Sequence, residues 1–165
     1  MALLTTAHAY LASPLGTVDL CGTDAGLTSV QFLDQALPET APTAVPECLR
    51  EAYRQVGAYF GRDLRAFTLR YNVAQGTDFQ RRVWAALSAV EFGRTASYSD
   101  VARQLGNPGA VRAVGAANGQ NPLGLVWPCH RIIGANGQLT GYAGGLWRKK
   151  WLLDFERPVA QGSLW

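Results

Sequence analysis

Apolar and polar positions alternate through the first third of the chain, and this pattern is typical of half-buried strands. The alternation predicts three strands, over residues 6–12, 17–22 and 27–33. Turn residues such as proline, glycine and aspartate lie in the two short gaps between them, so the strands should pair as an antiparallel meander. The proline-rich stretch that follows, 36–46, should be extended or irregular, because proline fixes φ and lacks an amide hydrogen.

A helical period replaces the alternation near residue 47. It predicts an amphipathic helix over 47–60 that ends at Gly61, with an apolar stripe formed by Leu49, Tyr53, Val56 and Phe60. A further short strand is predicted over 67–71. The periodic pattern then lapses at 72–76, so we expect a domain boundary there, between a domain of residues 1–76 and one of residues 77–165.

Helical patterns dominate the second half and predict helices over residues 79–90, 100–105, 109–117 and 146–155. Thr77 or Asp78 should cap the first helix, and Ser97 or Ser99 the second. Residues 106–108, Gly-Asn-Pro, should turn the chain before the third helix. The result is either a helix-turn-helix, whose second helix would lie in a DNA groove, or an ordinary hairpin of two core helices.

The last predicted helix has an aromatic face and a basic face. We expect an inward face of Trp147, Trp151, Leu152 and Phe155, and an outward face of Arg148, Lys149 and Lys150. Taken together, the elements predict an α+β protein with a small antiparallel sheet domain followed by a helical domain.

Composition and charge narrow the class of protein. The chain has 165 residues, of which 48% are hydrophobic and 16% charged, which excludes a disordered chain or a coiled coil. The net charge is +3, but residues 1–76 carry 5 basic and 7 acidic side chains, whereas residues 77–165 carry 10 and 5. Such an imbalance indicates an anionic partner such as nucleic acid for the second half, or a set of surface cations without a role.

The three cysteines, Cys21, Cys48 and Cys129, are an odd number without close CxxC spacing. They predict neither a disulfide framework nor a zinc site, and a reducing cytoplasm is the expected location. The first ten residues lack the basic start of a secretory signal. Because no apolar run approaches the roughly 20 residues of a membrane span, we expect no membrane partner.

The pentapeptide Trp127-Pro128-Cys129-His130-Arg131 is the clearest candidate for chemistry. A cysteine attacks as its thiolate, and an imidazole, a neighbouring cation or a helix start can promote ionisation. Adjacent side chains of an extended segment point in opposite directions, so a turn at Pro128 or a bridging water is required. Asp154 or Glu156 could orient the imidazole. The alternative is that Cys129 is a small buried hydrophobe and His130 a structural residue.

Six motifs in order give the second half a recognisable pattern: Gly106-Asn107-Pro108, Arg112-Ala113-Val114-Gly115, Asn121-Pro122, Pro128-Cys129-His130-Arg131, Gly141-Tyr142-Ala143-Gly144-Gly145 and Leu152-Leu153-Asp154-Phe155-Glu156. From Thr77 to Glu156 the chain resembles the O6-alkylguanine-DNA alkyltransferase family. The resemblance implies a ribonuclease H-like sheet domain followed by an all-α, winged-helix-like domain that contains a helix-turn-helix.

The resemblance also implies direct repair of alkylated double-stranded DNA. The alkyl group of O6-alkylguanine, and of O4-alkylthymine as a further substrate, would pass irreversibly to Cys129, in a single turnover and without a cofactor. The helix-turn-helix would bind in the minor groove and the damaged base would be flipped out, because its reactive carbon is shielded within the duplex. The protein would act as a monomer, with cooperative binding along DNA left open.

The resemblance implies catalytic and substrate-binding roles for particular residues. His130 would be a water-mediated base for Cys129, Glu156 would orient it, and Asn121 would brace the active-site turn. Tyr98 would help to rotate the nucleotide. Without the resemblance, a structural tyrosine at the edge of the core is an equally good interpretation of this residue. The substrate pocket would be formed by Trp127, Pro128, Tyr142, Ala143 and Gly144, where Trp127 replaces an aliphatic residue and Ala143 a serine found in some members.

The expected DNA contacts follow the same resemblance and comprise Tyr98, Arg112, Ala113, Gly115, Arg131 and Lys149. Arg112 would fill the gap left by the flipped base, unless it contacts phosphate or lies on a solvated helix face. Further phosphate contacts could come from Arg81, Arg82, Arg94 and Arg103. We expect no metal, because Cys21, Cys48 and His8 form no evident four-ligand set.

Two other classes of function fit parts of the sequence. A non-catalytic lesion-binding or helix-turn-helix regulatory protein would bind DNA without needing Cys129. A Cys-His hydrolase is disfavoured, because only one histidine lies near any cysteine in the sequence and no oxyanion motif is evident.

Overall fold

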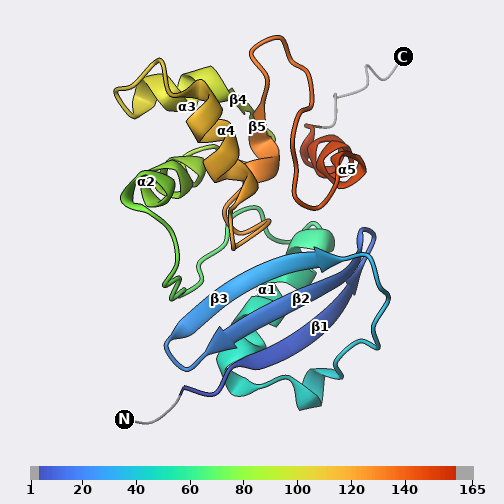
Figure 1. Cartoon of the computed structure of the whole chain (residues 1–165). Helices are drawn as coiled ribbons and strands as arrows, with labels where there is room; N and C mark the ends of the chain where they lie inside the picture. Colours follow the sequence, from blue (N-terminus) through green and yellow to red (C-terminus); the bar gives the residue numbers. More distant parts are fainter. Residues whose placement is uncertain (1–3, 159–165) are drawn as a thin grey trace, which may run out of the picture.

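A computed structural model describes residues 4–158 as a three-stranded sheet with one covering helix, joined to a helical half (Figure 1). The strands β1 (Ala7–Ser13), β2 (Gly16–Thr23) and β3 (Gly26–Leu33) pair antiparallel in the order β1-β2-β3. The three predicted strands are therefore confirmed to within about one residue at each end. Helix α1 (Arg50–Phe60) lies against one face of this sheet.

The first long helix is shorter than its sequence pattern predicts. Two short 3₁₀ turns, η1 (Pro42–Ala44) and η2 (Glu47–Leu49), precede α1, which ends at Gly61 as expected. Its buried residues are Ala52, Gln55, Val56 and Tyr59, whereas Tyr53 and Phe60 are only partly buried. The helix is thus rotated from the expected stripe, because both the sheet and α5 (Leu146–Glu156) supply partners for it.

The strand predicted over 67–71 does not form. The segment makes one isolated bridge, between Leu27 and Tyr71, in which the Leu27 amide donates to the Arg70 carbonyl at 3.0 Å. Earlier in the segment, the amide of Thr68 donates to the side chain of Gln55 on α1 at 2.9 Å. The segment is therefore held by α1 as well as by β3, and its pairing with β3 is limited to the single bridge at Tyr71.

The close approach of the two segments requires Gly26. Its φ is +138°, and a Cβ at this position would lie 2.9 Å from the backbone carbon of Tyr71. Only glycine tolerates both conditions. The absence of a side chain at Gly26 therefore lets Tyr71 lie directly against the start of β3.

The second half consists of α2 (Asp78–Leu87), α3 (Tyr98–Gln104), α4 (Val111–Gly119) and α5, with the short elements β4 (Ala96–Ser97), η3 (Cys129–Arg131) and β5 (Ile132–Ile133). Thr77 and Ser97 cap α2 and α3 through reciprocal capping boxes, as two of the four candidate caps predict. Helix α2 ends at Leu87, earlier than expected. The parallel pair β4 and β5 is two residues long and was not predicted.

Helix α5 does not have the expected faces. Leu152 is fully buried and Phe155 partly buried, but Trp147 is 56% exposed. Arg148 and Lys149, expected in solvent, are 4% and 0% exposed. The prediction fails because carbonyl groups from distant segments surround both cations and satisfy their donors, which removes most of the cost of burial.

The two halves meet along the edge of β3. The amide of Val30 donates to the Pro122 carbonyl at 2.9 Å, and the amide of Gly124 donates to the Val30 carbonyl at 3.1 Å. These bonds attach the loop that precedes Cys129 to the sheet. Across residues 4–158, the helices are all too short or too polar to span a bilayer.

Candidate active site

A tight turn places Cys129 at the start of η3. The Cys129 amide donates to the Trp127 carbonyl at 2.7 Å, and the side-chain amide of Asn121 donates to that same carbonyl at 2.7 Å. Asn118 donates to the carbonyl of Cys129 at 3.3 Å. The backbone thus turns at Pro128, which is one of the two alternatives expected for the Cys-His pair, and Asn121 lies where it can brace that turn.

The turn sends three successive side chains in different directions. Cys129 lines a cavity of about 390 Å³. His130 points into the protein toward Glu156 on α5, and Arg131 reaches the same carboxylate while lining a second cavity. A 3₁₀ turn makes this possible, because consecutive side chains are about 120° apart rather than opposed.

Glu156 is the centre of a buried polar cluster. Its Oε1 accepts hydrogen bonds from Tyr59 at 2.7 Å, from His130 Nε2 at 2.8 Å and from Arg131 Nη2 at 2.9 Å. Its Oε2 accepts from Arg131 Nε at 2.8 Å. Burial alone would raise the pKa of this carboxyl, but the hydrogen bonds and charges of His130 and Arg131 lower it to about 2. Glu156 is therefore a carboxylate at neutral pH.

The ionisation of Glu156 determines the tautomer of His130. A carboxylate can only accept hydrogen bonds, so His130 Nε2 carries the proton and Nδ1 carries the lone pair. Burial lowers the pKa of His130, which keeps the imidazole neutral. Among the described residues Nδ1 is buried and has no hydrogen-bond partner. A neutral imidazole with an unused basic nitrogen can serve as a general base.

The surroundings of Cys129 act on the pKa of its thiol in opposite directions. The residue is 6% exposed, and burial raises the pKa of its thiol. The Asn121 side chain and the positive charge of Lys149 act in the other direction and lower it. A buried thiol of this kind ionises efficiently only when a nearby base accepts its proton.

Lys149 and Arg131 were expected to contact DNA, and their burial contradicts that role. The ammonium of Lys149 donates to the carbonyls of Ile132 and Thr140, at 2.6 and 3.0 Å, and to the hydroxyl of Tyr98 at 3.3 Å. Arg131 is 6% exposed and bound to Glu156. In this structure both cations are buried and held by internal acceptors.

The walls of the Cys129 cavity come from both halves of the chain. Its lining includes residues of β3, of α4 and of the glycine-rich loop, among them Val30, Gln31, Phe32, Asn118, Asn121, Tyr142, Ala143 and Gly144. The expected pocket residues of the loop, Tyr142 to Gly144, therefore lie around the cysteine. The contribution of β3 was not expected from the sequence.

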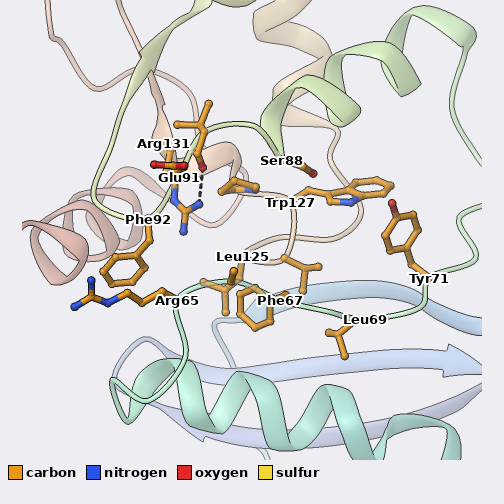
Figure 2. A pocket seen from close by; sticks show the side chains of 14 residues that line it. Arg65, Phe67, Leu69, Tyr71, Ser88, Glu91, Phe92, Leu125, Trp127 and Arg131 are labelled. Carbon is orange, nitrogen blue, oxygen red and sulfur yellow. Dashed lines mark hydrogen bonds between the residues drawn. The ribbon is translucent and has the colours of Figure 1, made fainter.

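Trp127 and Pro128 lie elsewhere, contrary to expectation. They line a second cavity of about 600 Å³ behind the active-site turn, where Figure 2 shows Trp127 near Tyr71 at one end and Arg65 near Phe92 at the other. The indole of Trp127 stacks on Trp84 with 5.6 Å between ring centroids. The tryptophan that replaces an aliphatic residue thus packs behind the nucleophile and does not narrow its cavity.

Helix α4, which follows α3 after a short turn, presents small residues and one arginine to solvent. On α4, Arg112 and Ala113 are exposed, whereas Val114 and Ala117 are buried against the rest of the domain. Gly115 lies beside the ring of Tyr98, whose hydroxyl donates to the Thr140 carbonyl at 2.9 Å. Tyr98 therefore contacts the glycine-rich loop and is not part of the cavity wall.

The other candidate phosphate contacts are exposed, but three of them already have partners. Arg81 donates to the carbonyls of Val73, Ala74 and Gly76, Arg82 donates to that of Leu105, and Arg103 pairs with Asp100. Arg94 is exposed. Because Arg81 holds the segment between the two halves, its first role is structural.

The sequence did not identify Tyr59 as a functional candidate. Ala52, Val56 and Tyr59 stand at i, i+4 and i+7, so a second apolar stripe was visible in α1 beside the expected one. Glu156, which accepts the hydrogen bond of the Tyr59 hydroxyl, lies 97 positions away, and no local pattern reveals that contact.

The sheet brings a second histidine and cysteine together, which the sequence spacing did not suggest. His8 stands opposite Cys21 in the register of β1 and β2, with His8 Nε2 3.8 Å from Cys21 Sγ. Within residues 4–158, no three His, Cys, Asp or Glu side chains gather as a metal site would require. The absence of a metal stays a prediction.

Both halves of the chain match the profiles of one known family. Residues 7–72 match the family profile described as "6-O-methylguanine DNA methyltransferase, ribonuclease-like domain", and residues 78–158 match its "DNA binding domain". The chain is 47% identical to the methylated-DNA–protein-cysteine methyltransferase of Mycolicibacterium paratuberculosis, over 92% of this chain and 93% of the relative. Its identity to the protein of that name from Methanosarcina acetivorans is 43%, over 90% and 97%.

Solved structures resemble the whole fold. The O6-methylguanine methyltransferase of Mycobacterium tuberculosis superposes with a TM-score of 0.81 at 41% identity, covering 97% of this chain and 98% of that one. The Mycobacterium tuberculosis OGT in complex with DNA superposes with a TM-score of 0.80 at 43% identity, over 92% and 95%. The fold, the two profile matches and these identities together show that the chain belongs to the O6-alkylguanine-DNA alkyltransferase family, the methylated-DNA–protein-cysteine methyltransferases.

Proposed function

We propose that this protein repairs alkylated DNA by transferring the alkyl group of O6-alkylguanine to the sulfur of Cys129. The observation that carries the proposal is the position of Cys129, which faces a cavity while the adjacent His130 is held by the buried carboxylate of Glu156. The relatives named as methylated-DNA–protein-cysteine methyltransferases support the reaction class.

The proposed reaction is a single displacement. The thiol proton of Cys129 passes through a bridging water to Nδ1 of His130, and the thiolate attacks the alkyl carbon. A carbon–sulfur bond forms as the bond between that carbon and O6 of guanine breaks. The guanine leaves with the bond electrons and takes up one proton. The product thioether is stable to water, so each protein molecule reacts once.

Three groups favour the reactive thiolate without leaving their places. Glu156 holds His130 in the tautomer that leaves Nδ1 free to accept. The buried ammonium of Lys149 and the Asn121 amide lower the pKa of the thiol. In a site shielded from water such fixed charges and dipoles are more effective than in solution, because they need no reorganisation during the reaction. This is the role that we propose for Lys149 in place of a DNA contact.

Substrate entry would require the damaged base to leave the duplex. The cavity of about 390 Å³ is within the usual size of ligand pockets, and Tyr142, Ala143 and Gly144 form part of its wall. We propose that a flipped base occupies it, with backbone amides of the loop near O6. O4-alkylthymine presents the same alkyl-oxygen group and is proposed as a second substrate.

We propose that the exposed face of α4 binds the minor groove. The small Ala113 and the nearby Gly115 permit close approach to a narrow groove, and the exposed Arg112 can occupy the gap left by the base. Residues 77–165 would then bind DNA and accept the alkyl group, while residues 1–76 support the site through β3.

A mass measurement tests the proposal directly. The protein is incubated with a duplex oligonucleotide that contains O6-methylguanine and is then digested. The peptide that contains Cys129 should gain one methyl group as the lesion becomes guanine. The Cys129→Ser variant should bind the same duplex and leave the lesion intact. An unmodified wild-type peptide beside an intact lesion would instead indicate a protein that binds lesions without repairing them.

A further inference from the structure

The side chain of Tyr59, in the sheet domain, reaches the polar cluster around Glu156 in the active site. It lies on α1, and its hydroxyl donates to Oε1 of Glu156 at 2.7 Å, although 97 positions separate the two residues. The tyrosine is 0% exposed and Glu156 is 2% exposed. The contact is therefore shielded from water, and its strength is not reduced by solvent competition.

The position of the hydroxyl is more specific than packing requires. Aromatic rings surround that of Tyr59 at centroid distances of 5.2 to 6.0 Å, from Phe60, Phe67, Phe92 and Phe155. A phenylalanine would satisfy those contacts equally well. A hydroxyl in such surroundings is costly unless it is paired, and here its partner is the carboxylate that holds His130.

Tyr59 competes with His130 for a single oxygen. Both donate to Oε1 of Glu156, which also accepts from Arg131 Nη2. Arg131 also binds Oε2, while the ammonium of Lys149 and the phenol of Tyr142 are the other ionisable groups that act on this cluster. Burial and the negative charge of Glu156 raise the pKa of Tyr59, so it remains a protonated donor throughout the range in which proteins are stable.

We propose that Tyr59 is a positioning residue through which the sheet domain sets the proton affinity of His130. This inference rests on the proposed function, because it concerns the base of the same reaction. By donating to Oε1, the hydroxyl takes part of the negative charge that would otherwise stabilise a protonated imidazole. It thereby keeps His130 neutral and able to accept the proton of Cys129.

The direction of the effect follows from this charge balance. Without the hydroxyl, Glu156 retains more negative charge toward His130, and the pKa of the imidazole rises. More of the protein then carries an imidazolium at mildly acidic pH, and an imidazolium cannot accept the thiol proton. The acidic limb of methyl transfer should therefore move to higher pH, while the affinity for DNA, which depends on a different face, should not change.

The test compares two tyrosines on one helix. Tyr59→Phe removes the hydroxyl that donates to Glu156. The matched control Tyr53→Phe removes a hydroxyl that donates to the Thr40 carbonyl on the other side of α1. His130 is titrated by carbon-13 NMR of its Cε1. We expect an upward shift of about 0.5 to 1 pH unit in Tyr59→Phe and none in Tyr53→Phe. Methyl transfer at pH 6 should slow several-fold relative to pH 8 in Tyr59→Phe alone.

An opposite perturbation keeps the test decisive if Tyr59→Phe folds poorly. Placing 3-fluorotyrosine at position 59 strengthens the donor and should lower the pKa of His130. An unchanged titration in both Tyr59 variants, or an equal shift in Tyr53→Phe, would overturn the inference. The NMR titration does not depend on methyl transfer. If the wild-type protein accepted no methyl group, the proposed function would be refuted. The titration would still show whether Tyr59 affects the pKa of His130.

Discussion

The guanidinium of Arg148 donates to the carbonyl of Gly144 at 2.8 Å and so ties the glycine-rich loop to helix α5. The same side chain donates to the carbonyls of Leu15 and Leu33, at 3.0 and 3.1 Å, and to Asp34 at 2.9 Å. Those three acceptors belong to the sheet domain. One buried arginine thus connects the wall of the Cys129 cavity to both the β1–β2 turn and the end of β3.

Replacement of Arg148 should loosen this connection. Arg148→Met keeps the length of the side chain but leaves buried carbonyls without donors, so we expect the free energy of unfolding to fall by about 3 kcal/mol. Methyl transfer should slow as well, because Gly144 loses an anchor. Denaturant unfolding checks the first effect. Lys150→Met, which changes an exposed cation of the same helix, should alter stability by less than about 0.5 kcal/mol.

His130→Gln separates the base from the hydrogen bond that holds it. The amide of glutamine can still donate to Glu156 but offers no basic nitrogen to Cys129. We expect methyl transfer at pH 7 to slow by about 100-fold or more, with little change in DNA affinity. The difference in rate between wild type and His130→Gln should decrease at higher pH, because the thiol of Cys129 then ionises without a base. Single-turnover rates across the pH range measure this, and a variant as fast as wild type at pH 7 would exclude His130 as the base.

Glu156→Gln should destabilise the protein in a pH-dependent way. At pH 7 the variant leaves the buried Arg131 without its counter-charge, and we expect a loss of about 3 to 5 kcal/mol. The pKa of Glu156 is lowered to about 2 in the folded protein, so its stabilising contribution is complete above the unfolded value and is lost as the pH falls toward 2.

The difference in unfolding free energy between wild type and Glu156→Gln should therefore decrease from pH 5 to pH 3. Unfolding curves at several pH values measure it. Glu51→Gln is the control, because Glu51 pairs with Arg54 on the exposed side of α1 and water screens that pair. A difference that stays constant with pH would show that Glu156 is not ionised in the native state.

Arg112→Ala should impair reaction with duplex DNA selectively. If the exposed arginine fills the gap left by a flipped base, its loss should slow methyl transfer from a duplex by about tenfold or more. Transfer from the free base O6-methylguanine, which needs no flipping, should be unaffected. Arg54→Ala removes an exposed arginine of α1 that is paired with Glu51, and serves as the control. Equal slowing of both reactions would indicate damage to the site itself.

Trp127→Leu tests the place of the tryptophan behind the active site. The substitution restores an aliphatic residue but removes the stacking on Trp84 and the edge contact with Tyr71. We expect the unfolding free energy to fall by roughly 2 to 3 kcal/mol, because the smaller side chain leaves a void. The relative rates for methyl and bulkier O6 adducts should not change. A shift in that preference would place the indole in the substrate cavity.

Much of this protein can be predicted from local sequence. Strand alternation, the caps Thr77 and Ser97, and the pattern around Cys129 each depend on residues within a few positions of one another. The need for either a turn at Pro128 or a bridging water also follows from the chain itself, because adjacent side chains of an extended segment point in opposite directions. The family resemblance of the second half rests on the same short motifs.

Tertiary structure decides the rest, for a physical reason. A helical period identifies an apolar stripe but not the number of neighbours a helix has, so it placed Lys149 and Arg148 in solvent, where isolated cations are normally most stable. Their burial depends on carbonyls that loops and strands far away in sequence supply. The partner of Tyr59 is hidden for the same reason. Local sequence therefore identified the nucleophile Cys129 and its neighbouring base His130, and only long-range packing decided which groups share the carboxylate of Glu156.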